Sequence, residues 1–216
     1  YSLTSRENLE KAEVIKPGRE PLRLANPMSK ELEFLRPSLR GSILSTLAYN
    51  LRHKEETVKI FEVGRTYNPI KDELPDEREV AICTLAGRRF HQSWNSSQEI
   101  IDFYDAKGVV EVIFDNLGLK PSFELSQDDD FLHPGKSSLI TYNGVQLGTI
   151  GEIHPRILDR FEIDVSPVAF VELYVETLLK FSQYNTRKFS DFSKFPASNR
   201  DLAIIIESDV TTEQIK

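Results

Sequence analysis

The stretch LANPMSKELEFLRPSLRGSILSTLAYNLRHKEETVKIFEVGRTY, residues 24–67, joins a helix pattern to a strand pattern. Apolar residues recur in its middle part every four positions, at Leu39, Ile43, Leu47 and Leu51. This spacing predicts one apolar stripe along a helix of about four turns, and Pro37 suits the first position of that helix. The β-rich run at residues 58–67 predicts a strand. Because the stripe must be covered, the stretch predicts a helix packed against a sheet.

The rest of the chain predicts more strands than helices that could connect a parallel sheet. Further strands are predicted at residues 22–25, 80–87, 139–142, 145–150 and 168–175. The charged run KDELPDERE at residues 71–79 is typical of an exposed hairpin loop. Asn143-Gly144 accepts positive φ at both central positions of a type I′ turn, which predicts a second hairpin. Both hairpins favour antiparallel pairing, so the fold class is α+β.

Three further helices are predicted from their end signals. The run Thr4-Ser5-Arg6-Glu7 has the spacing of a capping box, with the Thr4 hydroxyl at the helix start. Residues 102–117 carry apolar positions at helical spacing, and Gly118 provides a left-handed stop. His154-Pro155 opens another short helix.

Composition narrows the classes of partner. The formal net charge of -7 argues against a broad basic surface for nucleic acid, so any RNA contact would be local and no DNA partner is expected. No long apolar run and no signal peptide are found, so we expect a cytoplasmic protein without a membrane partner. The single cysteine, Cys83, cannot form an internal disulfide and is interpreted as a small core residue.

Five segments, in the same order along the chain, resemble the beta subunits of bacterial phenylalanyl-tRNA synthetases. They are LRLANPMS at residues 22–29, FLRPSL with its helix and KIFEVGRTY at 34–67, DFYDAKGVVE at 102–111, HPGKS with GTIGEIHP at 133–155, and KFPASNRDLAIII at 194–206. The resemblance implies a class II aminoacyl-tRNA synthetase-like antiparallel sheet flanked by helices. On this basis residues 1–190 form a catalytic-like but inactive domain.

Residues 191–216 resemble a linker and the truncated start of a ferredoxin-like anticodon-binding domain. A buried strand is predicted at residues 201–207, DLAIIIE. We expect the sequence to be part of a longer protein.

The resemblance also implies that the chemistry has been lost. Class II synthetases carry Phe-Arg-x-Glu in motif 2, and its arginine grips the α-phosphate of ATP. Here the degenerate motif is Phe61, Glu62, Val63 and Gly64, and an acid at Glu62 would repel the nucleotide. The motif 3 region, VAFVELYVETLL at residues 168–179, has neither glycine nor arginine. We therefore expect no catalytic, cofactor-binding or metal-binding residue in this segment, and no ordered pocket beside Glu62.

The implied function is a non-catalytic scaffold of a phenylalanine-tRNA ligase beta chain in an alpha2-beta2 assembly. Its partners would be the catalytic alpha chain and, in the holoenzyme, tRNA(Phe), with ATP and Mg²⁺ used by the holoenzyme alone. Candidate contacts with the alpha chain are the helix at residues 37–53 and the loop at residues 88–94. One alternative is a free-standing class II ligase paralogue that uses ATP, with Mg²⁺ held by acids such as Glu62, Glu152 and Glu172.

A second alternative is an RNA-binding module. Basic and aromatic residues alternate as they do in single-strand binders, at Arg88, Arg89, Phe90, His91 and Trp94. The competing interpretation is a connecting loop with Trp94 partly packed, or a contact with a partner chain.

Three further features have both a functional and a structural interpretation. His133 and His154 could bind a metal together with Glu152 or Asp128–Asp130, or they could anchor loops through hydrogen bonds at two His-Pro steps. The acidic run Asp128–Asp130 is otherwise a solvated loop. The run Gly148-Thr149-Ile150-Gly151 lies on a hairpin strand, so it predicts close packing in the sheet instead of a phosphate loop.

Overall fold

The computed structural model describes residues 1–15, 18, 20–53, 55–71, 73–90, 94, 99–126, 129–182, 194–196, 198–206, 210 and 215. The chain divides into two compact units, Tyr1–Thr186 and Arg187–Lys216. All the helices and strands given below belong to the first unit. No described helix is long and apolar enough to cross a membrane.

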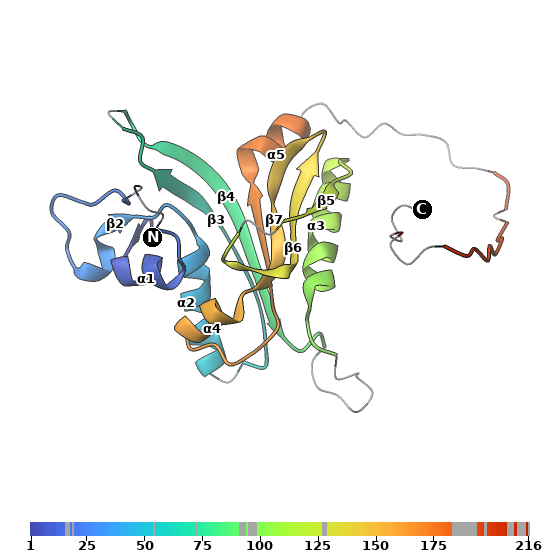
Figure 1. Ribbon diagram of the computed structural model, residues 1–216, viewed down its shortest axis with the longest axis horizontal. Coiled ribbons are helices and arrows are strands. Elements are labelled where there is room, and N and C mark those ends of the chain that lie inside the picture. The colour runs from blue at the N-terminus through green and yellow to red at the C-terminus, as the bar shows by residue number, and fades with distance from the viewer. Residues whose placement is uncertain are drawn as a thin grey trace. The chain divides into compact units, whose positions relative to one another are not determined.

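A six-stranded antiparallel sheet forms the centre of the first unit, with the strand order β3-β4-β8-β7-β6-β5 (Figure 1). Its strands are β3 (Thr57–Asn68), β4 (Asp76–Gly87), β5 (Ser122–Leu125), β6 (Leu132–Tyr142), β7 (Val145–Ile153) and β8 (Val168–Tyr174). A separate two-stranded sheet pairs β1 (Leu3–Thr4) with β2 (Phe34–Leu35). The predicted antiparallel α+β class is confirmed.

Helices cover both faces of the sheet (Figure 1). They are α1 (Arg6–Lys11), the 3-10 turn η1 (Lys30–Leu32), α2 (Arg40–Arg52), α3 (Phe103–Leu117), α4 (Pro155–Arg160) and α5 (Val175–Ser182). One core packs α2 and α4 against the first face, and a second core packs α3 and α5 against the other. We call these the α2 face and the α3 face.

The elements with the clearest end signals form as predicted. The side chains of Asp102 and Asp105 make a reciprocal capping box at the start of α3, and Gly118 ends it at φ 69°. In the β6–β7 hairpin, Asn143 and Gly144 have φ of 51° and 75°, as a type I′ turn requires. The pairing of β3 with β4 is also antiparallel over its whole length.

The glycines of β7 confirm the packing interpretation. A Cβ atom on Gly148 would lie 2.1 Å from the Glu172 carbonyl oxygen, and one on Gly151 would lie 2.8 Å from that of Lys136. Neighbouring backbone therefore occupies the space that a side chain would need.

The helix predicted from Pro37 starts later. Its first residue is Arg40, with Leu39 as N-cap, and the Ser38 hydroxyl accepts a hydrogen bond from the Arg40 N–H at 3.1 Å. The buried stripe is nevertheless the predicted one, because Leu39, Ile43 and Leu47 are buried beneath the helix.

Two other predicted elements near the N-terminus are displaced or reduced. The N-cap of α1 is Ser5, whose hydroxyl accepts from the Asn8 N–H at 3.1 Å, and not Thr4. The strand predicted at residues 22–25 is a single bridge between Arg23 and Phe34. Only β2 lies beside it among the described residues, and that strand is two residues long.

Strand β5 and helix α5 are among the elements that were not predicted. Strand β5 is a short edge strand, mostly exposed, so it carries little apolar alternation. Helix α5 follows β8 directly, with no turn residue between Tyr174 and Val175 to announce it.

In the second unit, the strand predicted at residues 201–207 is wrong for its described part. Residues 201–206 lie in no strand and are exposed, and Glu207 lies outside the described residues. A strand needs a neighbour for its backbone hydrogen bonds, and no described residue pairs with this segment.

The register of the sheet aligns the polar residues that matter for a site. One row of directly paired residues crosses five neighbouring strands, β3, β4, β8, β7 and β6. In this order its members are Glu62, Ile82, Glu172, Thr149 and Leu139. Directly paired residues point to the same face of a sheet. This row therefore crosses the α2 face, and it places Glu172 beside Thr149.

Candidate functional site

The degenerate motif 2 lies in the middle of β3. Phe61 and Val63 point away from α2 and are 78% and 51% exposed. Glu62 points to the α2 face instead, where the Ser42 hydroxyl of α2 donates to its Oε2 at 3.2 Å.

Glu62 is neutralised by an arginine that sequence reasoning missed. Arg36, which follows β2, contacts Glu62 Oε1 through Nη1, and its side chain is only 8% exposed. Its Nε also donates to the Arg65 carbonyl at 3.0 Å. A Cβ on Gly64 would lie 2.2 Å from Arg36 Nη2, so the glycine provides room for the guanidinium. Glu62, the acid that was predicted to repel a nucleotide, is therefore not a free acid, because Arg36 neutralises its negative charge within the fold.

The expectation of no pocket beside Glu62 is wrong. A hollow of about 650 Å³ is lined by Glu62, Arg36, and parts of α1 and α2. Helix α1 is only six residues long, and it meets α2 closely where Gly41 faces Asn8. The rest of α2 therefore stays uncovered on this side.

A larger hollow, of about 1200 Å³, lies over the polar half of the α2 face. We call it the sheet-face hollow. Strands β3, β4, β6, β7 and β8 contribute to its lining, together with α1 and the residues before β6.

Arg40 of α2 is held beside this hollow by two carboxylates. Its Nη1 and Nη2 donate to the two oxygens of Asp129 at 2.8 and 2.7 Å, and Nη2 donates to Glu172 Oε2 at 2.6 Å. Its guanidinium carbon lies 4.7 Å from the centre of the Phe131 ring and 5.6 Å from that of Phe170. Burial acts to lower the pKa of Arg40, but Glu172 and Asp129 outweigh burial and raise it. The arginine is therefore fully charged and fixed.

The interpretation of Asp128–Asp130 as a solvated loop is wrong for Asp129, which is bound to Arg40. Asp128 lies outside the described residues. Burial and the nearby charge of Glu172 also raise the pKa of Tyr174, whose ring lines the same hollow. Tyr174 therefore carries its proton at neutral pH.

The three acids considered for an Mg²⁺ site do not converge. Glu62 and Glu172 lie on the α2 face, whereas Glu152 pairs with Ala169 of the α3-face core. Each acid also has its own cation. Glu62 is bound by Arg36 and Glu172 by Arg40, and Glu152 accepts a hydrogen bond from Lys136 Nζ at 2.7 Å. Among the described residues, no three histidine, cysteine, aspartate or glutamate side chains are grouped as a metal site would require.

The two His-Pro steps make the same turn. His133 Nδ1 accepts the Gly135 N–H, and His154 Nδ1 accepts the Arg156 N–H, both at 3.1 Å. The two rings stack with centroids 6.2 Å apart. A neutral histidine that binds a metal through Nε2 carries its proton on Nδ1. Here Nδ1 of each histidine accepts a backbone N–H, so a proton on Nδ1 would point at that N–H and disfavour metal binding. The interpretation as loop anchors is confirmed.

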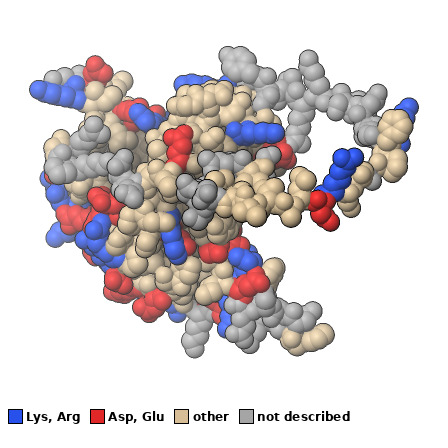
Figure 2. Space-filling view, turned by 45° about the vertical axis from the view of Figure 1, so that its right-hand side comes forward, with Lys and Arg blue, Asp and Glu red and all other residues tan. Residues whose placement is uncertain are grey.

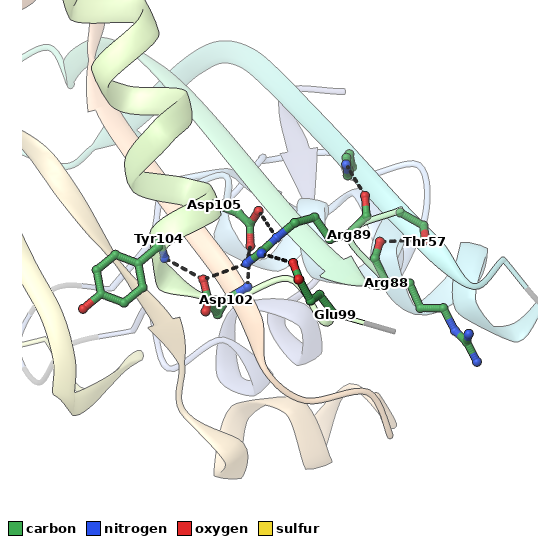
Figure 3. A network of polar contacts seen from close by, with 8 residues as sticks. Thr57, Arg88, Arg89, Glu99, Asp102, Tyr104 and Asp105 are labelled. Atoms are coloured by element: carbon green, nitrogen blue, oxygen red, sulfur yellow. Dashed lines mark hydrogen bonds and ion pairs between the residues drawn. The ribbon is translucent and has the colours of Figure 1, made fainter. Parts of the chain in front are cut away.

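The loop after β4 is the last candidate, and its Arg89 is bound by acids at the start of α3 (Figure 3). Arg89 donates to the Asp105 carboxylate at 2.9 and 3.0 Å and also contacts Glu99 and Asp102. The hydrogen bond that Arg89 donates to the Asp105 carboxylate raises the pKa of Arg89. Arg88 lies 3.7 Å from Glu56.

Arg89 thus joins the loop to the capping box of α3, which is a structural role. Trp94 is 97% exposed, so its predicted partial packing is wrong, and His91 lies outside the described residues. On the face that Figure 2 shows, basic and acidic side chains are interspersed and no continuous basic area is seen among the described residues.

The fold matches a solved synthetase. The structure of Desulfitobacterium hafniense PylSc, a pyrrolysyl tRNA synthetase, superposes with a TM-score of 0.62 at 13% identity, covering 85% of this chain and 61% of that one. At this identity the likeness concerns the fold, and it confirms the predicted class II synthetase-like sheet flanked by helices.

Sequence comparisons give the family. Residues 1–175 match the family model described as phenylalanyl tRNA synthetase beta chain CLM domain. The phenylalanine--tRNA ligase beta subunit of Dehalococcoides mccartyi strain CBDB1 is 34% identical over 217 residues, covering 100% of this chain and 26% of the relative. That of Syntrophotalea carbinolica is 34% identical over 219 residues, covering 100% and 27%. The chain spans about a quarter of the length of the curated relatives that it matches. It belongs to the phenylalanyl tRNA synthetase beta chain CLM domain family.

Proposed function

We propose that this chain is a non-catalytic scaffold module of a phenylalanine-tRNA ligase beta chain. In this role it supports the ATP-dependent charging of tRNA(Phe) by the catalytic alpha chain in an alpha2-beta2 assembly. ATP and Mg²⁺ serve the holoenzyme and have no site in this segment, and the assembly is cytoplasmic. Residues 1–190 form the inactive catalytic-like domain, and residues 191–216 form a linker and the start of a ferredoxin-like anticodon-binding domain. Its homology to ligase beta subunits supports this assignment.

The observation that carries the proposal is the pairing of Arg36, Arg40 and Arg78 with carboxylates on the α2 face. Arg36 is bound to Glu62, Arg40 to Asp129 and Glu172, and Arg78 to Asp76 at 2.7 Å. A triphosphate needs cations that are free to meet it. Arg36 and Arg40 could do so only by leaving carboxylates that are themselves largely buried.

ATP binding separates the scaffold from the ligase alternative. Isothermal titration of the 216-residue chain with ATP and Mg²⁺ is expected to give no binding heat. A dissociation constant in the millimolar range or tighter would favour the free-standing ligase. The RNA-binding alternative is tested in parallel with tRNA, for which salt-dependent affinity would count against the scaffold.

Assembly tests the scaffold role directly. Phe61 and Val63 form an exposed apolar pair on β3, so the double substitution Phe61→Glu and Val63→Glu is introduced into the intact beta chain and co-expressed with the alpha chain. Loss of the tetramer is expected, because obligate interfaces bury apolar area that two carboxylates would disrupt.

The control is Val112→Glu, at a 63% exposed position on α3. Normal assembly of the β3 variant, with the control also normal, would remove β3 from the interface. If assembly also survived charged substitutions at the remaining exposed apolar residues, the scaffold role would be lost.

A further inference from the structure

The sheet-face hollow carries more negative charge than its arginines neutralise. Its lining includes five carboxylates and three guanidiniums, from Glu10, Glu13, Asp129, Asp130, Glu172, Arg6, Arg40 and Arg78. Fully ionised, these groups sum to a charge of -2. An anionic ligand is therefore disfavoured here, and a cationic one is favoured.

Two of these carboxylates keep acceptor capacity. The Asp130 carboxylate makes no hydrogen bond or ion pair with any described residue, and only its backbone carbonyl is used, by Arg156. Arg40 contacts Glu172 only through Oε2. Oε1 of Glu172 is outside these contacts. A carboxylate accepts several hydrogen bonds, so both residues can receive donors from a ligand.

A buried hydroxyl beside Glu172 lacks a partner. Thr149, the cross-strand neighbour of Glu172, lines the hollow and is 6% exposed. Its Oγ1 is buried without a hydrogen bond to any described residue. Leaving such a group unsatisfied is costly, so a donor that reaches it is favoured. This observation is independent of the charge balance.

We propose that the sheet-face hollow binds a small organic cation, with its ammonium or guanidinium group at the carboxylates of Asp130 and Glu172 and the Thr149 hydroxyl as a further acceptor. The apolar part of the ligand lies against Val80, Leu139 and the Tyr174 ring, which also line the hollow. This binding site does not depend on the scaffold function, and its failure would leave that proposal untouched.

The test uses three probes of nearly equal size and different charge, n-butylammonium, n-butanol and n-butyrate. Binding to the 216-residue chain at neutral pH is measured by saturation-transfer NMR and by shifts of the Thr149 backbone amide signal. We expect n-butylammonium to bind in the millimolar range, as suits a fragment, n-butanol to bind more weakly, and n-butyrate not to bind. Equal binding of all three, or no binding of any, would overturn the proposal, the latter because the hollow would then hold water only.

Two variants locate the cation. Asp130→Asn is expected to weaken n-butylammonium binding by about tenfold, the scale of one charged hydrogen bond. Its control, Asp159→Asn, makes the same charge change at an exposed residue of α4 outside the hollow and is expected to have little effect. Equal losses in both variants would show only a general field effect and overturn the site.

The second variant, Thr149→Val, keeps the shape of the side chain and removes the unpaired hydroxyl. It is expected to fold at least as stably as the parent and to bind n-butylammonium more weakly. Unchanged affinity would remove Thr149 from the site.

Discussion

Arg36 and Glu62 form an ion pair at the position where motif 2 synthetases carry their nucleotide-binding arginine. The arginine comes from outside the motif strand, and its side chain is 8% exposed. A guanidinium is thus present near the motif, but it is bound to Glu62 and to the Arg65 carbonyl within the fold. For the proposed scaffold, this ion pair is a second reason, beside the acid at Glu62, to expect no phosphate binding here.

Restoring the arginine of the motif should not restore nucleotide binding. In Glu62→Arg, two guanidiniums would face each other and the buried Arg36 would lose its partly exposed partner, at a cost of about 3 kcal/mol of unfolding free energy. Urea denaturation measures the loss of unfolding free energy, and isothermal titration with ATP and Mg²⁺ is expected to give no binding heat. Glu62→Gln is the control, which keeps a hydrogen-bond acceptor and should cost less. Tight ATP binding by Glu62→Arg would contradict the account.

A side chain at Gly64 should displace the Arg36 guanidinium. In Gly64→Ala the new Cβ would lie 2.2 Å from Arg36 Nη2, so the guanidinium must move away from Glu62. We expect a loss of about 1–3 kcal/mol in unfolding free energy, as for a buried charged hydrogen bond. Gly108→Ala in α3 is the matched control, because nothing lies within 4 Å of its added Cβ. That change should stabilise the helix by up to about 1 kcal/mol. Equal effects in the two variants would contradict the steric argument.

Arg40 should be a main electrostatic support of the α2 face. Arg40→Ala leaves Asp129 and Glu172 without their shared cation, which is expected to cost about 3–5 kcal/mol. The variant also opens a space that fits a guanidinium ion. Low concentrations of guanidinium chloride should therefore raise its melting temperature, whereas sodium chloride at the same concentration should not. The parent chain should show no such rescue.

Cys83 should react slowly in the folded chain. Burial raises the pKa of its thiol from the ordinary 9.0 to about 11, so little thiolate is present at pH 8. Alkylation by iodoacetamide, followed by mass spectrometry, should be slow at pH 8 and fast in urea. Because the folded pKa is the higher one, Cys83 should reduce stability as the pH rises from about 9 towards about 11. Equal alkylation rates in the folded and unfolded chains would contradict burial.

Alanine substitutions at Arg88 and Arg89 should distinguish a structural role of this loop from RNA binding. Arg89→Ala breaks the contacts with Asp105 and Glu99 and should lower the melting temperature by loosening the start of α3. Arg88→Ala loses only a 3.7 Å contact with Glu56 and should change stability little. Neither variant should alter tRNA affinity. If both variants lowered tRNA affinity by a similar factor, the RNA-binding alternative would be supported.

Local patterns determined the elements whose signals are complete within a few residues. The capping box and Gly118 fixed α3, Asn143-Gly144 fixed the β6–β7 hairpin, and the His-Pro steps fixed two loop anchors. In each case the decisive hydrogen bonds or dihedral angles involve residues close in sequence. Where a neighbour had to be supplied from elsewhere, as for β5 or the strand predicted at residues 22–25, the local pattern failed.

The charge pairs of the α2 face were decided by the tertiary structure alone. Arg36 meets Glu62 across 26 residues, and Arg40 meets Glu172 across 132. Such distances along the chain hide the pairing, because a charge in a sequence does not specify its partner. The sequence by itself determined the antiparallel class and the family, and it places an acid, Glu62, in the strand that resembles motif 2. Only folding decided that Glu62 is neutralised, since the approach of two distant strands and a helix sets which charges share a buried surface.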